Sequence, residues 1–131
     1  MRLLLDTHIW QWSLASPGKL GRKLRAALAR RGTQLWLSPV SVWELLVLAE
    51  RGRIRLGSEP RQWISDALGS TPASEAPLTY QVAVRSRDVL MGHDDPADRF
   101  LVATALVYDL TLATADEYLI GARACPILAN R

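Results

Sequence analysis

The stretch Met1-Arg2-Leu3-Leu4-Leu5-Asp6 places three consecutive leucines immediately before an acid. A short, uninterrupted apolar run is typical of a central parallel strand that is covered on both faces. The run is far too short for a signal peptide or a membrane span, so we expect no association with membranes. The acid that follows should lie just beyond the carboxyl end of the strand, where open parallel sheets form their ligand sites.

Apolar runs alternate with stretches at helical spacing along the rest of the chain. Strands are predicted over residues 3–5, 34–37, 110–113 and 127–129, with a very short one at Leu78. Helices are predicted over about 9–14, 19–31, 39–52, 58–68, 81–90, 95–106 and 115–120, and residues 69–77 are expected to form a loop. This alternation predicts an α/β fold with a parallel sheet between two layers of helices.

The 131 residues fit one domain, 1–131, with 49% hydrophobic and 22% charged residues, which is ordinary globular usage. The one cysteine, Cys125, cannot form an internal disulfide, so we expect a reducing, cytoplasmic setting. The net charge of +3 comes mainly from arginine, because Lys19 and Lys23 are the only lysines. Arginine suits phosphate or carboxylate partners, although the basic runs at 22–31 and 51–61 could equally be solvated helix faces.

Four acids from distant parts of the chain are predicted at one edge of the sheet: Asp6, Glu44, Asp98 and Asp116. Carboxylates grouped closely repel one another, and some must take up protons unless a cation shares the site. Oxygen ligands suit Mg²⁺ or Mn²⁺, which can orient and deprotonate a water for attack on a phosphodiester. No Gly-rich phosphate loop is present, and the two histidines, His8 and His93, do not favour a two-histidine nuclease.

Three of these acids also have a simpler explanation as helix-start residues. Glu44 could close a capping box with Ser41, and Asp98 could be favoured by the dipole of a helix capped by Asp95. Asp116 could cap its own short helix in the same way. Only Asp6 has no such alternative, and the alternatives do not explain why all of these acids should share an edge.

Four segments resemble the successive motifs of PIN-domain ribonucleases, and the likeness is closest to VapC-type toxins. The resemblance runs in order over about residues 1 to 120. The segments are Leu3-Leu4-Leu5-Asp6-Thr7-His8, Ser38-Pro39-Val40-Ser41-Val42-Trp43-Glu44, His93-Asp94-Asp95-Pro96-Ala97-Asp98-Arg99 and Leu112-Ala113-Thr114-Ala115-Asp116.

The resemblance implies a three-layer α/β/α sandwich with a central, mostly parallel sheet, and an endoribonuclease that cleaves RNA with a metal-activated water. Its implied catalytic and metal-binding residues are Asp6, Glu44, Asp98 and Asp116, with Mg²⁺ or Mn²⁺ as cofactor. Its implied accessory residues are Asp95, Thr7, Thr114 and Arg99, of which Arg99 is the basic residue best placed to meet a scissile phosphate or the acids. It further implies a small cognate antitoxin as partner and a homodimer.

Two other functions compete with this interpretation. A phosphorylated receiver-like domain needs a late lysine, and the chain has none after Lys23. A catalytically silent PIN-like module that only binds proteins is disfavoured by the presence of all four acids. Among the tryptophans, we expect Trp36 and Trp43 in the core and one of Trp10 and Trp12 at the surface, because residues two apart cannot share a helix face.

Overall fold

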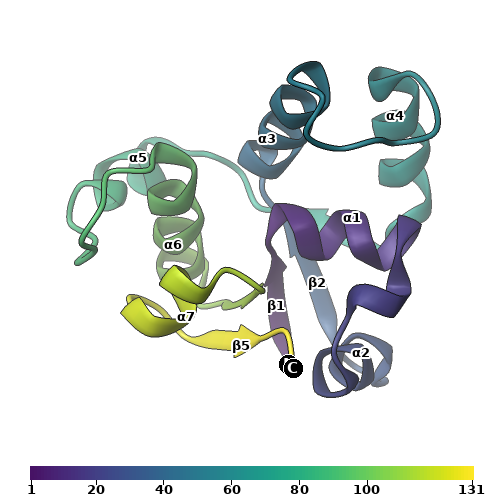
Figure 1. Cartoon of the computed structure of the whole chain (residues 1–131). Coiled ribbons are helices and arrows are strands. Elements are labelled where there is room, and N and C mark those ends of the chain that lie inside the picture. The colour runs from purple at the N-terminus through teal and green to yellow at the C-terminus, as the bar shows by residue number, and fades with distance from the viewer.

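The computed structural model covers residues 1–131 and contains one five-stranded, all-parallel sheet in the order β3-β2-β1-β4-β5 (Figure 1). The strands are β1 (Arg2–Leu5), β2 (Gln34–Leu37), β3 (Ala73–Glu75), β4 (Thr111–Thr114) and β5 (Ile127–Ala129). The helices are α1 (Thr7–Ala15), the 3-10 turn η1 (Pro17–Lys19), α2 (Arg22–Ala29), α3 (Pro39–Glu50), α4 (Pro60–Ser70), α5 (Tyr80–Ser86), α6 (Pro96–Tyr108) and α7 (Glu117–Ala122). The predicted α/β/α sandwich with a parallel central sheet is confirmed.

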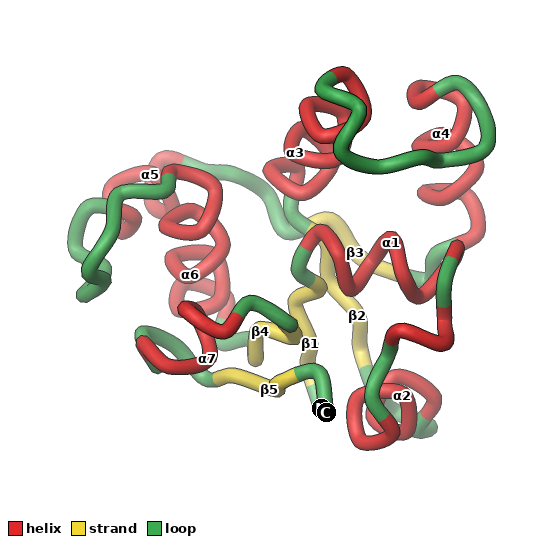
Figure 2. Tube along the Cα trace, viewed as in Figure 1, coloured by secondary structure: helices red, strands yellow, loops and turns green.

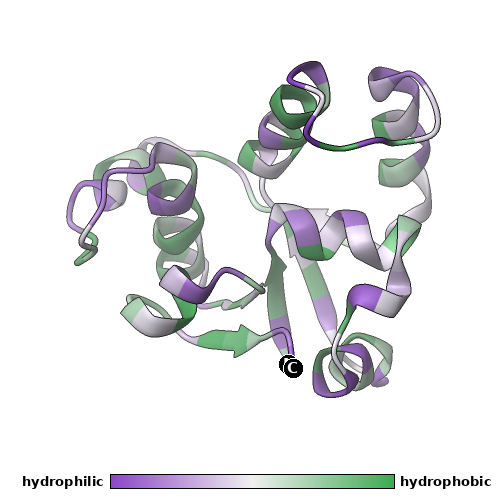
Figure 3. Cartoon of the chain, viewed as in Figure 1, coloured by the Kyte–Doolittle hydropathy of each residue, from purple (hydrophilic) through white to green (hydrophobic).

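The central strand β1 separates two hydrophobic cores, because successive side chains of a strand point to opposite faces. Leu3 and Leu5 are fully buried in the core formed with α1, α2, α3 and α4, whereas Leu4 is buried in the core formed with α5, α6 and α7. These two groups of helices lie on opposite sides of the strands (Figure 2). The three leucines of β1 therefore contribute to the hydrophobic cores on both faces of the sheet, and the strand is hydrophobic along most of its length (Figure 3).

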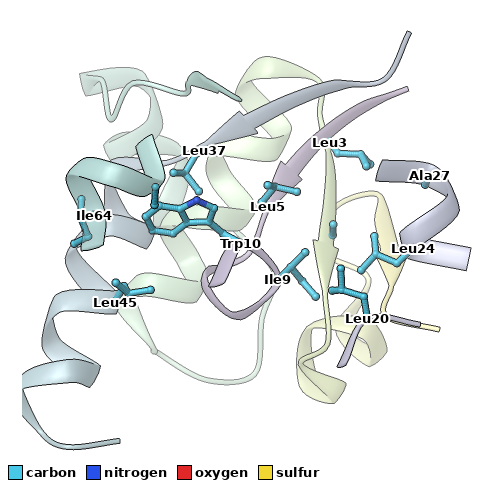
Figure 4. Packing of buried hydrophobic residues seen from close by; sticks show 12 residues of the cluster. Leu3, Leu5, Ile9, Trp10, Leu20, Leu24, Ala27, Leu37, Leu45 and Ile64 are labelled. Atoms are coloured by element: carbon cyan, nitrogen blue, oxygen red, sulfur yellow. The ribbon is translucent and has the colours of Figure 1, made fainter. Parts of the chain in front are cut away.

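Trp10 fills the centre of the first core and is completely buried. It lies among Leu5, Leu37, Leu45 and Ile64, which come from two strands and two helices (Figure 4). Burial of a large aromatic side chain contributes strongly to stability. Trp10 therefore anchors α1 to the sheet. The first residue of this helix, Thr7, directly follows Asp6 of the predicted site.

The clearest difference from the predicted elements is β3. It lies within the predicted loop, and Leu78 belongs to no strand. The three residues of β3 are small or polar and largely exposed, so they carry no apolar pattern, and their pairing with β2 at the sheet edge creates the strand. An edge strand of this kind depends on its neighbour for its structure.

Several boundaries and one tryptophan also differ from expectation. The second predicted helix, 19–31, is shorter, since η1 takes up its start and α2 runs only from Arg22 to Ala29. Helix α5 ends at Ser86. Trp43, predicted in the core, is 57% exposed on α3. Trp10 is buried, and Trp12, its neighbour two residues later, is partly exposed but still packs against the core. No helix combines the length and the apolar character needed to cross a bilayer.

Candidate functional site

The four predicted acids meet at a hollow beyond the carboxyl ends of the central strands. Asp6 follows β1 directly, and Asp116 follows β4 after one intervening residue. Glu44 reaches the hollow from α3 and Asp98 from the first turn of α6. The hollow has a volume of about 290 Å³, and its lining residues are Asp6, Glu44, Asp95, Asp98, Asp116, His8, Trp12 and Ala115. Four separate segments thus supply carboxylates to one place.

Asp6 is the most rigidly held of these acids. It is 8% exposed; its Oδ1 accepts the Thr7 backbone N–H at 2.7 Å, and its Oδ2 accepts the Thr114 hydroxyl at 2.6 Å. Burial raises the pKa of Asp6, and the two hydrogen bonds only partly oppose this rise. Asp6 is also the N-cap of α1, so it does have the local structural role that its sequence context did not reveal.

Thr114 connects the first acid to the last. Its hydroxyl donates to Asp6 and accepts the backbone N–H of Asp116 at 3.0 Å. Asp116 in turn caps α7, since its Oδ1 accepts the backbone N–H groups of Tyr118 at 2.8 Å and Leu119 at 3.2 Å. The predicted cap is present, and the other oxygen of Asp116 makes no hydrogen bond to the protein.

The structure excludes the capping-box explanation of Glu44. Helix α3 is capped by Ser38, whose hydroxyl accepts the Val40 N–H at 3.0 Å, so Ser41 lies inside the helix and Glu44 in its second turn. Burial raises the pKa of Glu44, and the charges of Asp6 and Asp95 add to the effect. The explanation of Glu44 as a helix-start residue is therefore wrong, because the helix begins one turn earlier.

The hydroxyl of Thr7 is a buried polar group beside these acids. Thr7 is 1% exposed, and its Oγ1 has no hydrogen-bond partner of acceptable geometry within the protein. It is still close enough to Glu44 to lower the pKa of that carboxyl, against the larger rise caused by burial. A buried hydroxyl without a partner costs free energy, so Glu44, beside which it lies, is the natural partner of the Thr7 hydroxyl.

Asp98 and Asp95 stand together at the start of α6. Oδ1 of Asp95 accepts the Asp98 backbone N–H at 3.1 Å, which confirms Asp95 as the N-cap. Burial raises the pKa of Asp98 to about 7, and the charges of Asp95, Asp116, Asp6 and Glu44 contribute further. Burial first, and the neighbouring carboxylates second, therefore make Asp98 much easier to protonate than an ordinary aspartate.

Arg99 does not face this hollow. It is 7% exposed, and its guanidinium donates to the carbonyls of Ser86 at 3.0 Å, Val89 at 3.0 Å and His93 at 3.3 Å. Its carboxylate neighbour is the exposed Asp94, at 3.8 Å. The expectation that Arg99 meets the acids or a phosphate does not match this geometry, because every donor group of Arg99 is directed at the loop between α5 and α6.

Sequence reasoning missed two residues that organise the site. Tyr118 in α7 packs its ring against His93, with centroids 4.0 Å apart, and its hydroxyl accepts the backbone N–H of Gly92. The Nε2 atom of His93 lies 3.4 Å from Oδ2 of Asp98. The motif that contains His93 was recognised, but nothing in the spacing indicated the contact with Tyr118, which lies 25 residues later in the sequence.

A family model described as "PIN domain" matches residues 3–123. The chain belongs to the PIN-domain family. This PIN domain is 32% identical over 123 residues to Ribonuclease VapC22 of Mycobacterium tuberculosis, an alignment that covers 89% of the chain and 88% of the relative. The matched region includes all four acids of the hollow and most of β1, and it ends before β5.

Solved structures resemble this PIN domain over its whole length. A chain of VapBC2 from Rickettsia felis, crystallised with a promoter DNA fragment, superposes with a TM-score of 0.71 at 12% identity and covers 98% of both chains. A chain of DNA-bound VapBC from Salmonella typhimurium also gives 0.71, at 15% identity, covering 100% of this chain and 99% of that one. At these identities the likeness establishes the fold.

Proposed function

We propose that this chain is a Mg²⁺- or Mn²⁺-dependent endoribonuclease and the toxin of a VapBC-like toxin–antitoxin module. The observation that carries the proposal is the meeting of Asp6, Glu44, Asp98 and Asp116 at one hollow in a PIN-domain chain. The name of the 32% identical relative, a ribonuclease, supports RNA as the substrate. The proposal also extends to one domain over residues 1–131, because both hydrophobic cores share the same sheet.

A divalent cation with oxygen ligands fits the residues that line the hollow. Burial raises the pKa of Asp6, Glu44 and Asp98, neighbouring carboxylates add to each rise, and a cation would relieve that repulsion. The unpaired Thr7 hydroxyl adds a neutral oxygen at the same place. No three of the acidic or histidine side chains converge closely enough to form a ready-made cage. Mg²⁺ does not need one, since it keeps several waters and binds through one or two carboxylates.

The residues have separate roles in this proposal. Asp6, Glu44, Asp98 and Asp116 would hold the cation, Thr114 orients Asp6, and Asp95 fixes the start of α6. A divalent cation bound there would supply Lewis-acid activation of water and neutralise charge on the scissile phosphate. His8 and Trp12 form the remaining wall, and the Lys19 ammonium lies 5.5 Å from the centre of the Trp12 ring, so a cationic aromatic surface borders the acids.

The proposed partners follow from the same family. The VapBC names of the solved neighbours support a small antitoxin as the cognate protein. Homodimer formation remains a prediction, supported by two strongly exposed apolar side chains on α5, Tyr80 at 95% and Val84 at 68%, which line one surface hollow with Leu106 and Val107. A cytoplasmic location, expected from the single free cysteine, likewise remains a prediction.

Cleavage of an RNA pool by the purified chain tests the proposal. We expect fragments in Mn²⁺ or Mg²⁺ and none in EDTA, and sequencing of the new ends would give the cleavage context. Asp6→Asn should abolish cleavage, because it removes a ligand charge without changing the size of the side chain. Asp109→Asn is the matched control. Asp109 is exposed and ends α6 in the left-handed conformation, which asparagine also adopts readily.

Two results would contradict the proposal. Equal cleavage by Asp6→Asn and by the unchanged chain would remove Asp6 from the site. Absence of cleavage under all metal conditions, with normal binding of an antitoxin, would instead favour the silent protein-binding module.

A further inference from the structure

Helix α7 holds the loop that leads into α6 through one side chain, Tyr118. The Tyr118 ring packs on the His93 imidazole with centroids 4.0 Å apart and planes inclined by 49°. The Tyr118 hydroxyl accepts the backbone N–H of Gly92. Tyr118 is two residues after Asp116, and His93 is five residues before Asp98, so this contact joins the two segments that carry these acids.

The missing side chain of Gly92 allows the close approach of Tyr118. A Cβ atom built on Gly92 would lie 2.8 Å from the Tyr118 hydroxyl oxygen, which is closer than side chains normally pack. Any larger residue at this position would push the tyrosine or the loop away. The absence of a side chain at Gly92 therefore belongs to the same arrangement as the Tyr118 contact.

Both ring nitrogens of His93 face the start of α6. Nδ1 accepts the backbone N–H of Asp95 at 3.0 Å, so the neutral ring carries its proton on Nε2. Nε2 lies 3.4 Å from Oδ2 of Asp98, a carboxylate that is mostly buried. His93 thus presents a donor to Asp98 while its own orientation is set by Asp95 on one side and Tyr118 on the other.

We propose that Tyr118 and His93 form a positioning bridge that sets the distance and orientation of Asp98 relative to Asp116 at the acidic hollow. The proposal rests on the proposed function, because it concerns how the hollow receives its cation. Together with Thr114, the bridge completes a chain of contacts that runs from Asp6 through Asp116 and α7 to Asp98.

The bridge answers a physical problem at this site. Asp95, Asp98 and Asp116 repel one another, and the residues between Ser86 and α6 have no regular structure of their own to hold them. Arg99 anchors this loop to α6, whereas Tyr118 supplies its contact with α7, so loss of Tyr118 would let the loop and α7 move apart before a cation arrives. Groups that orient metal ligands typically change metal affinity by about 10- to 100-fold when they are removed.

Mn²⁺ titration of metal-free protein, without RNA, is the first test. We expect His93→Ala to weaken Mn²⁺ binding by about 10- to 100-fold. His93→Gln should recover much of the loss, since its amide keeps a donor of similar reach. Tyr118→Phe should weaken binding to a lesser extent, because the ring remains and only the hydroxyl contact with Gly92 is lost.

The matched control is Tyr108→Phe. The Tyr108 hydroxyl likewise makes one hydrogen bond to the backbone, donating to the Pro77 carbonyl at 2.8 Å, but it lies at the other end of α6. Its removal should leave Mn²⁺ affinity unchanged. Because Tyr118 and His93 act in one chain, the double variant Tyr118→Phe/His93→Ala should cost less affinity than the two single losses combined.

Amide hydrogen exchange of metal-free protein provides a readout that needs neither metal nor RNA. Both His93→Ala and Tyr118→Phe should speed exchange in residues 92–98 and in α7 together. Unchanged exchange there, or Mn²⁺ affinity that is the same in His93→Ala and the unchanged chain, would overturn the bridge. If the unchanged chain binds Mn²⁺ but cleaves no RNA, the proposed function fails while the bridge is still judged by affinity and exchange.

Discussion

The Thr114 hydroxyl donates a 2.6 Å hydrogen bond to Oδ2 of Asp6 from the end of the neighbouring strand. Both residues are buried, so this bond stabilises a charged carboxylate where water can do little for it. The same hydroxyl accepts the Asp116 backbone N–H. One threonine therefore sets the relative position of the first and last acids of the hollow.

Replacement of Thr114 by valine should impair the site while preserving the shape of the core. Asp6 would lose its hydroxyl donor, its pKa would rise further, and its carboxylate would bind a cation less readily. A hydrogen bond to a charged group contributes about 1.5–3 kcal/mol, so we expect Mn²⁺ affinity to fall by about tenfold or more. Thr114→Ser keeps the hydroxyl and is the control. Calorimetric titration of both variants measures the difference, and equal affinities would show that Asp6 does not need Thr114.

The raised pKa of Asp98 predicts how stability depends on pH in the metal-free protein. This pKa is about 7 in the folded chain, above the ordinary value of 3.8, so the folded state binds the proton more tightly. The contribution to stability is complete below about pH 4 and is lost as the pH rises through 7. Asp98→Asn should remove this loss, so the variant should gain stability relative to the unchanged chain between pH 4 and 7.

Urea unfolding in EDTA at several pH values checks this expectation. The difference between Asp98→Asn and the unchanged chain is the informative quantity, because other carboxylates titrate in both proteins. A difference that stays constant from pH 4 to 8 would contradict the raised pKa. Saturating Mn²⁺ should reverse the order of stability, since only the unchanged chain retains the full set of ligands.

The central part of the fold could be predicted because its residues carry strong local signals. The leucine run of β1 and the Asp95-Pro96 start of α6 lie where their sequence predicts. Strand β3 could not be predicted, because Ala73, Ser74 and Glu75 acquire strand structure only by pairing with β2. Trp43 was misplaced for a related reason: it is as apolar as the core residues of α3, and only the packing of that helix decides which side faces water.

The acids of the site could be predicted from strand ends and motif order, but their supports could not. The roles of Tyr118 and His93 depend on a contact between segments that are distant in the sequence. Arg99 was expected to serve the acids because it is adjacent to Asp98 in sequence. Neighbouring residues on a helix point in different directions, and Arg99 points to the loop.

Arg99 should therefore affect stability and local order more than RNA contact. Arg99→Lys replaces the planar fork with a single ammonium, which cannot reach the carbonyls of Ser86, Val89 and His93 together. We expect a loss of about 1–3 kcal/mol in the free energy of unfolding for each buried carbonyl left unpaired. Faster amide exchange over residues 87–95 should accompany it. A variant with unchanged stability but weaker RNA binding would instead restore the phosphate-contact role.

The last prediction concerns the C-terminal residues, which follow β5 at the carboxyl edge of the sheet and cap α2. The Arg131 carbonyl accepts the backbone N–H of Lys23 at 2.8 Å, and the Asn130 side chain accepts the Gly21 N–H at 2.7 Å and donates to the Lys19 carbonyl at 3.0 Å. A Cβ atom on Gly21 would collide with the Arg131 backbone. Gly21→Ala should therefore displace the terminus and release this cap.

Loss of this cap should lower the free energy of unfolding. We expect Gly21→Ala and Asn130→Ala each to cost about 1–2 kcal/mol in urea unfolding, the usual range for a helix N-cap. Gly18→Ala is the matched control, since nothing lies within 4 Å of a Cβ at that position. Because the Asn130 backbone N–H donates to the Thr114 carbonyl at 2.8 Å, Gly21→Ala should also weaken Mn²⁺ binding, whereas Gly18→Ala should not. Equal stability of Gly21→Ala and Gly18→Ala would show that the C-terminal residues do not cap α2.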